Sequence, residues 1–518
     1  MPFGFRLFHK AIPAWIKTKL NLRKTIQKEL KQLVPDYKIP RDKLKFSSHH
    51  LSHAASAFFP SPFDEAAILI IDGVGEWATV SIGKGIGNKI ELIEQINFPH
   101  SLGMLYSAFT EYLGFRVNYG EYKLMGLSPY GKWESTETKM YYTKIKNQLI
   151  RVWEDGFFEL NLDYFQFNRK EKMARNSKWE ALFGLKLRSK NVAFRQSHAN
   201  LALAIQKVTE EIVLGLAKRA VEKTGCQNLV MAGGVALNGV ANGILIQEKF
   251  IKDVWVQPAA SNTGGAPGAA MVGAILNDKS CDISKLKTSF RNAFLGDRIY
   301  LPDWQEQLQV ADYEIKTFSD HQSMAVYVAD LIIDDHLIGW VQGSFEFGPR
   351  ALGARSIIAS PLKKSSQERI NRDLKFREDF RPFAPAMLKE EVLRLYDFPY
   401  AVPYMQFVTK IKPEFRYPLP ADFHEKPIIE RVKIPVAQLE AVTHVDYSSR
   451  LQVVEDKGHP FFELLIALKE KTGYGVVLNT SFNMAGEPMV SSIKDIFDCF
   501  EQTALDTLVI ENTVIKKK

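Results

Sequence analysis

The sequence predicts an α/β fold, because short apolar strands are followed by glycine turns and then by helices, and this order repeats along the chain. Two such units stand out: a strand at 228–231 with a turn at 232–234, and a strand at 254–257 with a turn at 260–265 and a small-residue helix at 269–276. The 518 residues exceed the roughly 150 of an ordinary domain, so we expect more than one domain.

Composition places the chain among globular proteins. Hydrophobic residues make up 46% and charged residues 24%, which excludes the disordered and fibrous classes. The three cysteines, Cys226, Cys281 and Cys499, are too scattered for a disulfide framework or a thiolate zinc site, so a reducing, cytoplasmic setting is expected. No apolar run approaches the roughly 18 residues of a membrane span, and the start has no signal-peptide pattern; we expect no transmembrane segment.

The positive charge is concentrated at the start of the chain. The net charge is +8, yet residues 1–46 alone contain 12 Lys or Arg against three acidic residues. Apolar residues between 12 and 33 recur at helical spacing, and Pro35 ends the pattern, which predicts a basic amphipathic helix. Such a helix suits either a membrane surface or docking on its own domain, and we favour docking. Because the charge is local, no nucleic-acid partner is expected.

Further elements follow from local signals. A helix is expected at 47–59, with Ser47 or Ser48 as N-cap and Pro60 as stop. Strands at 66–72 and 79–82 read as a hairpin around a turn at 73–76, and a long helix spans 197–223. A polar stretch at 277–287 is taken as the domain boundary. Beyond it we expect a helix and strand within 324–341, a strand at 475–478, and a final helix and strand within 493–515.

Two histidines form the sharpest local feature. His49 and His53 are four residues apart, so on a helix both imidazoles face the same side, as a chelating pair requires. Asp72 stands at the end of a predicted strand, a common position for active-site acids in α/β folds. The competing interpretations are a structural histidine pair and a turn-capping aspartate.

Two groups of residues suggest anion binding. The glycine turns at 232–234 and 264–265 allow backbone N–H groups to approach a nucleotide, although glycine also simply permits turns. Residues 346–381 interleave Arg and Lys with Phe, Pro, Leu and Gly, so these cations are partly desolvated and need anionic partners. Phosphate recognition and pairing with internal carboxylates such as Glu346 and Glu378 explain them equally well.

Strings along the whole chain together resemble the bacterial O-carbamoyltransferase family, which includes nodulation-protein-U-type and antibiotic-tailoring enzymes. The matching strings are HHLSHAASAFFPSPF, LIIDGVGEWAT, FPHSLGMLYSAF, GEYKLMGLSPYG, MAGGVALNGVAN, QPAASNTGGAPGAA, EFGPRALGARSI, LKFREDFRPFAP, THVDYSSRLQVV and VVLNTSFN.

The resemblance implies two domains and two reactions. Residues 1–285 would form an actin/sugar-kinase-like domain, incomplete at its start, and residues 286–518 a YrdC-like α/β domain. The second domain would convert carbamoyl phosphate and ATP, with Mg for the ATP, into carbamoyl adenylate. The first would transfer the carbamoyl group to a hydroxyl of a biosynthetic acceptor such as a sugar, antibiotic or glycolipid. A divalent metal, iron in the family, is implied beside that site, and a homodimer is a further expectation.

The resemblance also assigns roles residue by residue. His49, His53, Asp72 and Asn262 match the metal positions, and Asp72, Lys375 and Arg377 match catalytic ones. The candidate substrate- and nucleotide-binding residues are Gly233, Gly234, Asn238, Gly264, Gly265, Arg350, Arg355, Arg450, Ser481 and Asn483.

This chain departs from the family pattern in three respects. It is expected to lack the first strands of the N-terminal domain, Asn262 replaces a metal-ligating aspartate, and Ala354 replaces an asparagine. Two other classes are therefore kept as alternatives. One is a partly degenerate homologue acting as a binding or regulatory subunit, and the other is an ATP-dependent kinase of the actin-like superfamily.

Overall fold

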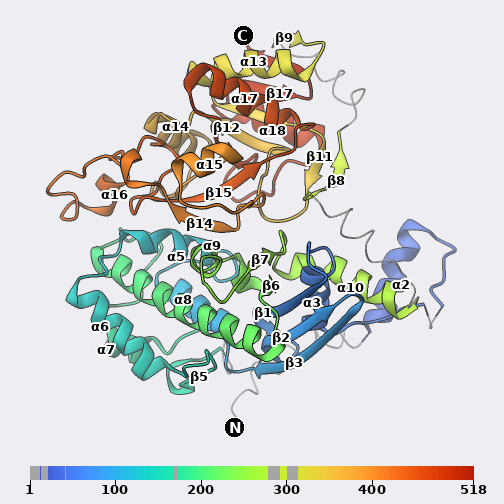
Figure 1. Cartoon of the computed structure of the whole chain (residues 1–518), viewed down its shortest axis with the longest axis vertical. Helices are drawn as coiled ribbons and strands as arrows, with labels where there is room; N and C mark the ends of the chain where they lie inside the picture. The colour runs from blue at the N-terminus through green and yellow to red at the C-terminus, as the bar shows by residue number, and fades with distance from the viewer. Residues whose placement is uncertain (1–11, 13–20, 41–42, 168–171, 278–291, 300–312) are drawn as a thin grey trace.

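The computed structural model describes residues 12, 21–40, 43–167, 172–277, 292–299 and 313–518. These residues form two bodies of mixed α/β structure, one from the blue-to-green part of the chain and one from the yellow-to-red part (Figure 1). The expected α/β class is thereby confirmed, whereas the actin-like and YrdC-like assignments stay predictions. The expected domain boundary at 285/286 lies outside the described residues.

The N-terminal body is built on a five-stranded sheet in the order β3-β2-β1-β6-β7. Its strands are β1 (Glu65–Gly75), β2 (Ala78–Ile86), β3 (Lys89–Asn97), β6 (Asn228–Ala232) and β7 (Asp253–Val256). Strands β1, β6 and β7 are mutually parallel, and β2 and β3 pair antiparallel at the other side of β1. A separate two-stranded ribbon joins β4 (Ile150–Val152) to β5 (Phe158–Leu160).

Helices cover both faces of this sheet, because β1 is apolar on both sides. Ala67, Leu69 and Ile71 belong to the core formed with α4 and α8, whereas the alternate residues Ile68 and Ile70 pack with α3 and α10. The helices of this body are α2 (Leu22–Leu33), α3 (His49–Phe58), α4 (Leu102–Tyr112), α5 (Glu121–Leu127), α6 (Thr136–Lys144), α7 (Asn176–Phe183), α8 (Gln196–Thr224), α9 (Gly239–Leu245) and α10 (Asn262–Asn277).

The C-terminal body contains a nine-stranded mixed sheet in the order β14-β15-β13-β16-β12-β10-β17-β18-β9. Its strands are β9 (Tyr313–Thr317), β10 (Ile338–Val341), β12 (Arg355–Ala359), β13 (Ala384–Leu388), β14 (Phe407–Lys410), β15 (Ser448–Val454), β16 (Val476–Ser481), β17 (Thr507–Ile510) and β18 (Thr513–Lys517). A short ribbon pairs β8 (Phe294–Arg298) with β11 (Ser344–Glu346). The helices are α13 (His321–Ile333), α14 (Lys364–Arg369), α15 (Lys389–Leu395), α16 (Ile428–Arg431), α17 (Pro460–Thr472) and α18 (Ile493–Gln502).

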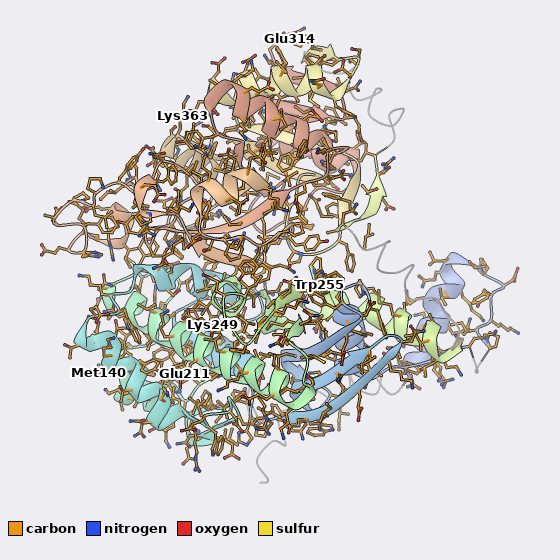
Figure 2. All side chains as sticks on the ribbon, in the orientation of Figure 1. Met140, Glu211, Lys249, Trp255, Glu314 and Lys363 are labelled. Carbon is orange, nitrogen blue, oxygen red and sulfur yellow. The ribbon has the colours of Figure 1, made fainter. Side chains whose placement is uncertain are left out.

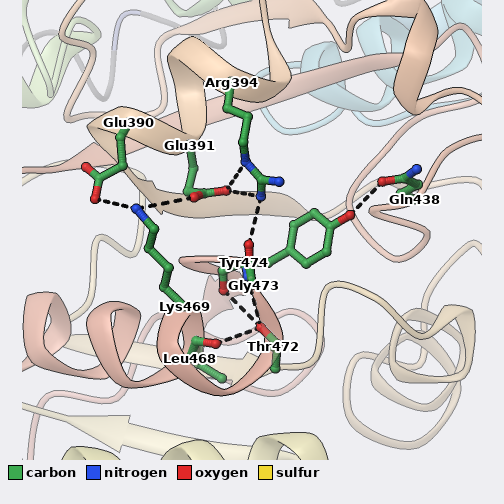
Figure 3. A network of polar contacts seen from close by, with 9 residues as sticks. All are labelled: Glu390, Glu391, Arg394, Gln438, Leu468, Lys469, Thr472, Gly473 and Tyr474. Carbon is green, nitrogen blue, oxygen red and sulfur yellow. Dashed lines mark hydrogen bonds and ion pairs between the residues drawn. The ribbon is translucent and has the colours of Figure 1, made fainter.

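A polar network joins α15 to α17 in this body (Figure 3). The Glu391 carboxylate is 1% exposed and accepts from Arg394 Nε at 3.1 Å. Arg394 also donates to the carbonyl of Gly473, the left-handed residue that ends α17, at 2.9 Å. Because every residue drawn contacts another member of the network, we assign the network a structural role.

Most predicted elements occur where the sequence placed them, and three differ. Strand β1 runs on to Gly75 through an irregularity after Ile71, so the expected turn at 73–76 is mostly bulged strand. Helix α10 begins at Asn262, seven residues before the expected start, so the glycine turn forms its first turn. The basic helix is seen as α2, but it has no buried residue and Leu33 is 78% exposed, so the expected docking is not observed in its described part.

The two bodies touch through α9 and β14 (Figure 1). Asn242 Nδ2 donates to the carbonyl of Gln406 at 3.0 Å, and Gln406 Nε2 donates to the carbonyl of Val256 at 2.7 Å. All three residues are buried. Among the helices described here, none is long and apolar enough to cross a membrane.

Candidate functional site

The parallel strands β1, β6 and β7 bring the N-terminal candidates to one edge of the sheet. Asp72 lies in β1 just past the residues that pair with β6, and Gly233 and Gly264 follow the carboxyl ends of β6 and β7, where α/β folds place their ligands. Gly233 has φ +92°, and a Cβ there would lie 2.3 Å from the carbonyl oxygen of Ile71. Only glycine therefore allows the loop after β6 to approach β1 so closely.

His49, His53 and Asp72 converge on one point. His49 Nε2 lies 3.0 Å from Asp72 Oδ2 and 3.1 Å from His53 Nε2, and His53 Nε2 lies 3.7 Å from Asp72 Oδ2. One ligand atom from each residue falls within 4.8 Å of the others. Two imidazole nitrogens and a carboxylate oxygen form a donor set that suits iron or zinc, so these residues fit a divalent metal.

Neighbouring groups hold the three residues in place. Gly234 N–H donates to Asp72 Oδ1 at 3.1 Å, which leaves Oδ2 for the histidines. The adjacent His50 has a different partner, because its Nδ1 lies 2.6 Å from Ser81 Oγ on β2. Burial lowers the pKa of His50 to about 4, so this ring is neutral at physiological pH and anchors α3 to the sheet.

The charge state of Asp72 follows from its partners. Burial alone would raise the pKa of this carboxyl, but hydrogen bonds from His49, His53 and the Gly234 N–H outweigh burial and hold the pKa well below its usual range. The hydrogen bond with Asp72 raises the pKa of His49, although burial opposes it. Asp72 is therefore ionised at neutral pH, as a cation-binding carboxylate must be.

The fourth predicted metal position, Asn262, is less closely connected. It is exposed at the start of α10, and among the described residues no hydrogen bond joins it to His49, His53 or Asp72. Helix α10 nevertheless packs directly along α3, because Gly268 brings its backbone against Ser52. The role of Asn262 as a ligand stays a prediction.

The remaining N-terminal candidates have structural partners. Asn238 caps α9 by accepting from Ala241 N–H at 3.2 Å, and its side chain exchanges two hydrogen bonds of 3.1 Å with Gln206. Gly264 donates to the carbonyl of Ala259 at 2.9 Å, whereas a Cβ on Gly265 would meet no atom within 4 Å. Open space therefore adjoins the first turn of α10 at Gly265.

In the C-terminal body the predicted lysine meets the predicted serine and asparagine. Lys375 Nζ donates to the carbonyl and Oγ of Ser481 at 2.5 and 3.3 Å, and to the carbonyl and Oδ1 of Asn483 at 2.8 and 2.6 Å. The lysine is 4% exposed, and its hydrogen-bond acceptors among the described residues are carbonyl, hydroxyl and amide oxygens. Burial first, and then the nearby Arg377 and Arg381, hold its pKa well below the usual range.

The charges of Arg377 and Arg381 act on this lysine, and those two arginines in turn interact with Arg350 and Arg450. Arg350, Arg377, Arg381 and Arg450 influence one another's charge, and burial lowers the pKa of Arg350 to about 10. Asn371 orients Arg377 by accepting from its Nε at 2.6 Å. We call these four arginines and Lys375 the cation cluster. So many partly desolvated cations suit a phosphate-bearing ligand.

Arg355 stands apart from the cation cluster. Its side chain is fully buried, and its guanidinium donates to main-chain carbonyls of Gln342, Gly343, Ala354 and Asp297 at 2.9 to 3.3 Å. Glu346, considered above as a partner for these cations, instead accepts backbone N–H groups of Leu352, Ala354 and Arg355. The structure thus gives Arg355 a core role, and its binding role stays a prediction.

Several residues near the cation cluster were not singled out from the sequence. Asn371 is 1% exposed beneath Arg377, and Tyr122 and Lys123 arrive from α5 of the N-terminal body. Arg381 lies over the Tyr122 ring at 4.6 Å, and Lys123 pairs with Glu378 at 2.8 Å. Tyr122 and Lys123 belong to the matching string GEYKLMGLSPYG, but nothing in that string shows that it reaches the other body.

Comparison with protein families assigns the class. Residues 2–271 match the carbamoyltransferase N-terminus model and residues 329–517 match the carbamoyltransferase C-terminus model. The chain belongs to the carbamoyltransferase family, and this membership supports a transferase.

Individual proteins are similar to this chain over different shares of its length. The chain is 42% identical to the uncharacterized protein sll1178 of Synechocystis, over 100% of this chain and 83% of that protein. It is 34% identical to nodulation protein NolNO of Sinorhizobium fredii, over 98% and 68% of the two chains. It is 28% identical to the 3'-hydroxymethylcephem-O-carbamoyltransferase of Amycolatopsis lactamdurans, over 55% and 48%. Full-length HypF aligns at a TM-score of 0.23 and 12% identity over 40% of this chain and 22% of that chain.

Proposed function

We propose that the chain is an O-carbamoyltransferase that makes carbamoyl adenylate from carbamoyl phosphate and ATP and passes the carbamoyl group to an acceptor hydroxyl. The cation cluster supports the first reaction. Water releases the phosphate of carbamoyl phosphate, and the resulting carbamate oxygen attacks the α-phosphorus of ATP and displaces pyrophosphate. Charge that develops on the phosphoryl oxygens is what buried Lys375 and the neighbouring arginines would stabilise.

The second reaction is proposed for the sheet edge at Asp72. There the acceptor hydroxyl would attack the carbamoyl carbon, its proton would pass to a nearby carboxylate, and AMP would leave. A divalent metal, iron by family resemblance, would be held by His49, His53 and Asp72 and would supply Lewis-acid polarisation of the carbonyl. Asp72, ionised and fixed by Gly234, keeps the two imidazoles directed at the same point.

The acceptor is proposed only as a class. The relative from Amycolatopsis lactamdurans is named for carbamoylating a hydroxymethyl group of a cephem, and it shares 28% identity over 55% of this chain. By extension from this relative, we propose that the acceptor of the present chain is a hydroxyl group of a small biosynthetic molecule. Mg for the ATP, a cytoplasmic setting and a homodimer remain part of the same proposal.

The observation that carries the proposal is the environment of Lys375, so its removal is the test. Pyrophosphate release is measured with full-length protein, MgATP and carbamoyl phosphate. We expect release that depends on carbamoyl phosphate, and a loss of about 100-fold or more in Lys375→Ala, by analogy with removal of one stabilising donor of transition-state charge. Lys146→Ala is the matched control, because Lys146 forms an ion pair of 2.5 Å with Glu211 in the other body. Absence of release from the unaltered chain contradicts the proposal.

Two further measurements separate the alternative classes. A degenerate binding or regulatory subunit would carry no stoichiometric metal, whereas the proposal expects metal that is lost in His49→Ala. A kinase would leave a phosphorylated acceptor and ADP, whereas a carbamoyltransferase leaves a carbamoylated acceptor and AMP. Elemental analysis and mass spectrometry of the products distinguish these outcomes.

A further inference from the structure

The carboxylate of Glu378 stands beside the cation cluster. It follows Arg377 directly in the chain, and its negative charge acts on that guanidinium. Its Oε2 is buried and has no hydrogen-bond partner among the described residues. A carboxylate in this position could pair with the arginines and so compete with any phosphate that binds there.

A residue from the other body engages the second oxygen. Lys123 Nζ lies 2.8 Å from Glu378 Oε1, across 255 positions of sequence, and the two side chains are 19% and 35% exposed. Lys123 comes from α5, which lies at the boundary between the two bodies in Figure 1. The neighbouring Tyr122 places its ring 4.6 Å from the guanidinium carbon of Arg381. Helix α5 therefore reaches the C-terminal body with two consecutive side chains, Tyr122 at Arg381 and Lys123 at Glu378.

Helix α5 is itself tied to the N-terminal site. Its first residue, Glu121, accepts from Ser107 Oγ of α4 at 2.6 Å. The N-cap of α4 is Ser101, whose hydroxyl donates to the carbonyl of Gly73 at 2.6 Å, next to Asp72. Lys123 is thus held by a short, continuous series of contacts that starts at β1.

We infer that Lys123 binds Glu378 and keeps this carboxylate from pairing with the arginines, so that the N-terminal body sets the anion affinity of the C-terminal cation cluster. Lys123 is a positioning residue, since it acts through Glu378. The inference rests on the proposed function for the identity of the anion, a phosphate or polyphosphate ester. The competition between Glu378 and that anion rests on the contacts above.

A double-variant experiment tests the inference against simple docking of the two bodies. Calorimetry measures binding of inorganic triphosphate to the full-length chain. Lys123→Met keeps the side-chain stem and removes the charge, and we expect binding to weaken about fivefold or more, because the released carboxylate then competes for the arginines. Adding Glu378→Gln to Lys123→Met should restore binding close to that of the unaltered chain. Lys123→Arg should bind normally.

Other results overturn the inference. If the ion pair serves only to dock the bodies, the double variant binds as weakly as Lys123→Met or more weakly, since neither variant then has the pair. The inference is also contradicted if Lys123→Met binds triphosphate as well as the unaltered chain does, or if the unaltered chain does not bind triphosphate. Lys146→Ala is the matched control, because it removes a lysine–glutamate pair whose partner Glu211 lies well away from the boundary (Figure 2).

The failure of the inference and that of the proposed function are distinguishable. Triphosphate binding needs no turnover, so a chain that binds triphosphate but releases no pyrophosphate contradicts the proposed reaction and leaves the Lys123 result intact. Where pyrophosphate is released, Lys123→Met should raise the KM for carbamoyl phosphate about fivefold or more with little change in kcat. A fall in kcat at constant KM would overturn the role assigned to Lys123.

Discussion

His198 shows how a single buried group makes stability depend on pH. It is 4% exposed at the start of α8, and its Nδ1 accepts from the backbone N–H of Arg195 at 2.9 Å, which requires an unprotonated nitrogen. Burial, and then the charges of Arg188 and Arg195, lower the pKa of His198 to about 4. The folded chain therefore keeps this ring neutral where an unfolded chain would protonate it.

Acid should accordingly destabilise the chain through His198. The pKa rises from about 4 to the ordinary 6.5 on unfolding, so the unfolded state binds more protons between these values and stability falls as the pH drops through this window. The loss should reach roughly 2 kcal/mol by pH 5. Melting temperatures from pH 7.5 to 5 check this: His198→Gln, which does not titrate, should lose less than the unaltered chain. Equal losses would show that His198 is not responsible.

At the scale of elements, the metal-binding pair depends on how two helices pack. Helix α3 carries both histidines, and α10 crosses it where Gly268 contacts the backbone of Ser52. A Cβ at Gly268 would lie 1.8 Å from the Ser52 carbonyl oxygen. The position of α3, and with it the direction of both imidazoles, therefore requires glycine at this crossing.

Gly268→Ala should consequently push α3 away from the sheet edge. We expect a destabilisation of about 1–3 kcal/mol, the usual range for overpacking, together with lower metal content in the purified protein. Gly273→Ala in the same helix is the matched control, because a Cβ there meets no atom within 4 Å and should leave stability unchanged or raised by up to about 1 kcal/mol. Thermal denaturation and elemental analysis provide the two readouts. Similar behaviour of the two variants would contradict the packing argument.

At the scale of the whole molecule, the contact between α9 and β14 that joins the two bodies is close-packed and includes buried hydrogen bonds. Gly243 of α9 approaches β14 so closely that a Cβ would lie 1.8 Å from the Val408 carbonyl oxygen. The adjacent Asn242 and Gln406 are 1% and 6% exposed and bond across the boundary. A cleft of about 590 Å³ opens beside this contact, lined in part by Gln206, Glu210 and Lys410.

Gly243→Ala should separate the two bodies without unfolding either of them. We expect calorimetric unfolding to split into two transitions, or the first transition to fall in temperature, because overpacking removes contacts that couple the bodies. Gly126→Ala is the control at the same boundary, since its nearest atom, Pro382 Cδ, would be 3.8 Å from the new Cβ. If both variants melt as the unaltered chain does, the α9–β14 contact does not couple the bodies.

The elements were predictable because their signals are local. Hydrophobic periodicity, N-cap residues and helix-ending residues located α3, α8 and β6 to within about two residues. The start of α10 was missed because the glycine signal was read as a turn, whereas in the structure Gly264 and Gly265 lie in the first turn of the helix, which contacts α3 at Gly268. The pairing of His49 with His53 followed from helical spacing. The convergence of this pair with Asp72 depends on how α3 packs against β1, which no local pattern predicts.

The sequence by itself determined the α/β class, the family, and which residue types could bind a metal or a phosphate. These follow from hydrophobic periodicity and ordered motifs, which depend only on the order of residues in the chain. Tertiary structure alone decided how those residues are used. Arg350 and Arg355 stand in one motif, yet the first joins the cation cluster while the second is buried among main-chain carbonyls. Lys123 meets Glu378 only because the two bodies are in contact. Burial, and contacts with residues hundreds of positions away, set the charge state of a side chain and the ligands that it can still bind. Both the burial and the contacts exist only in the folded molecule.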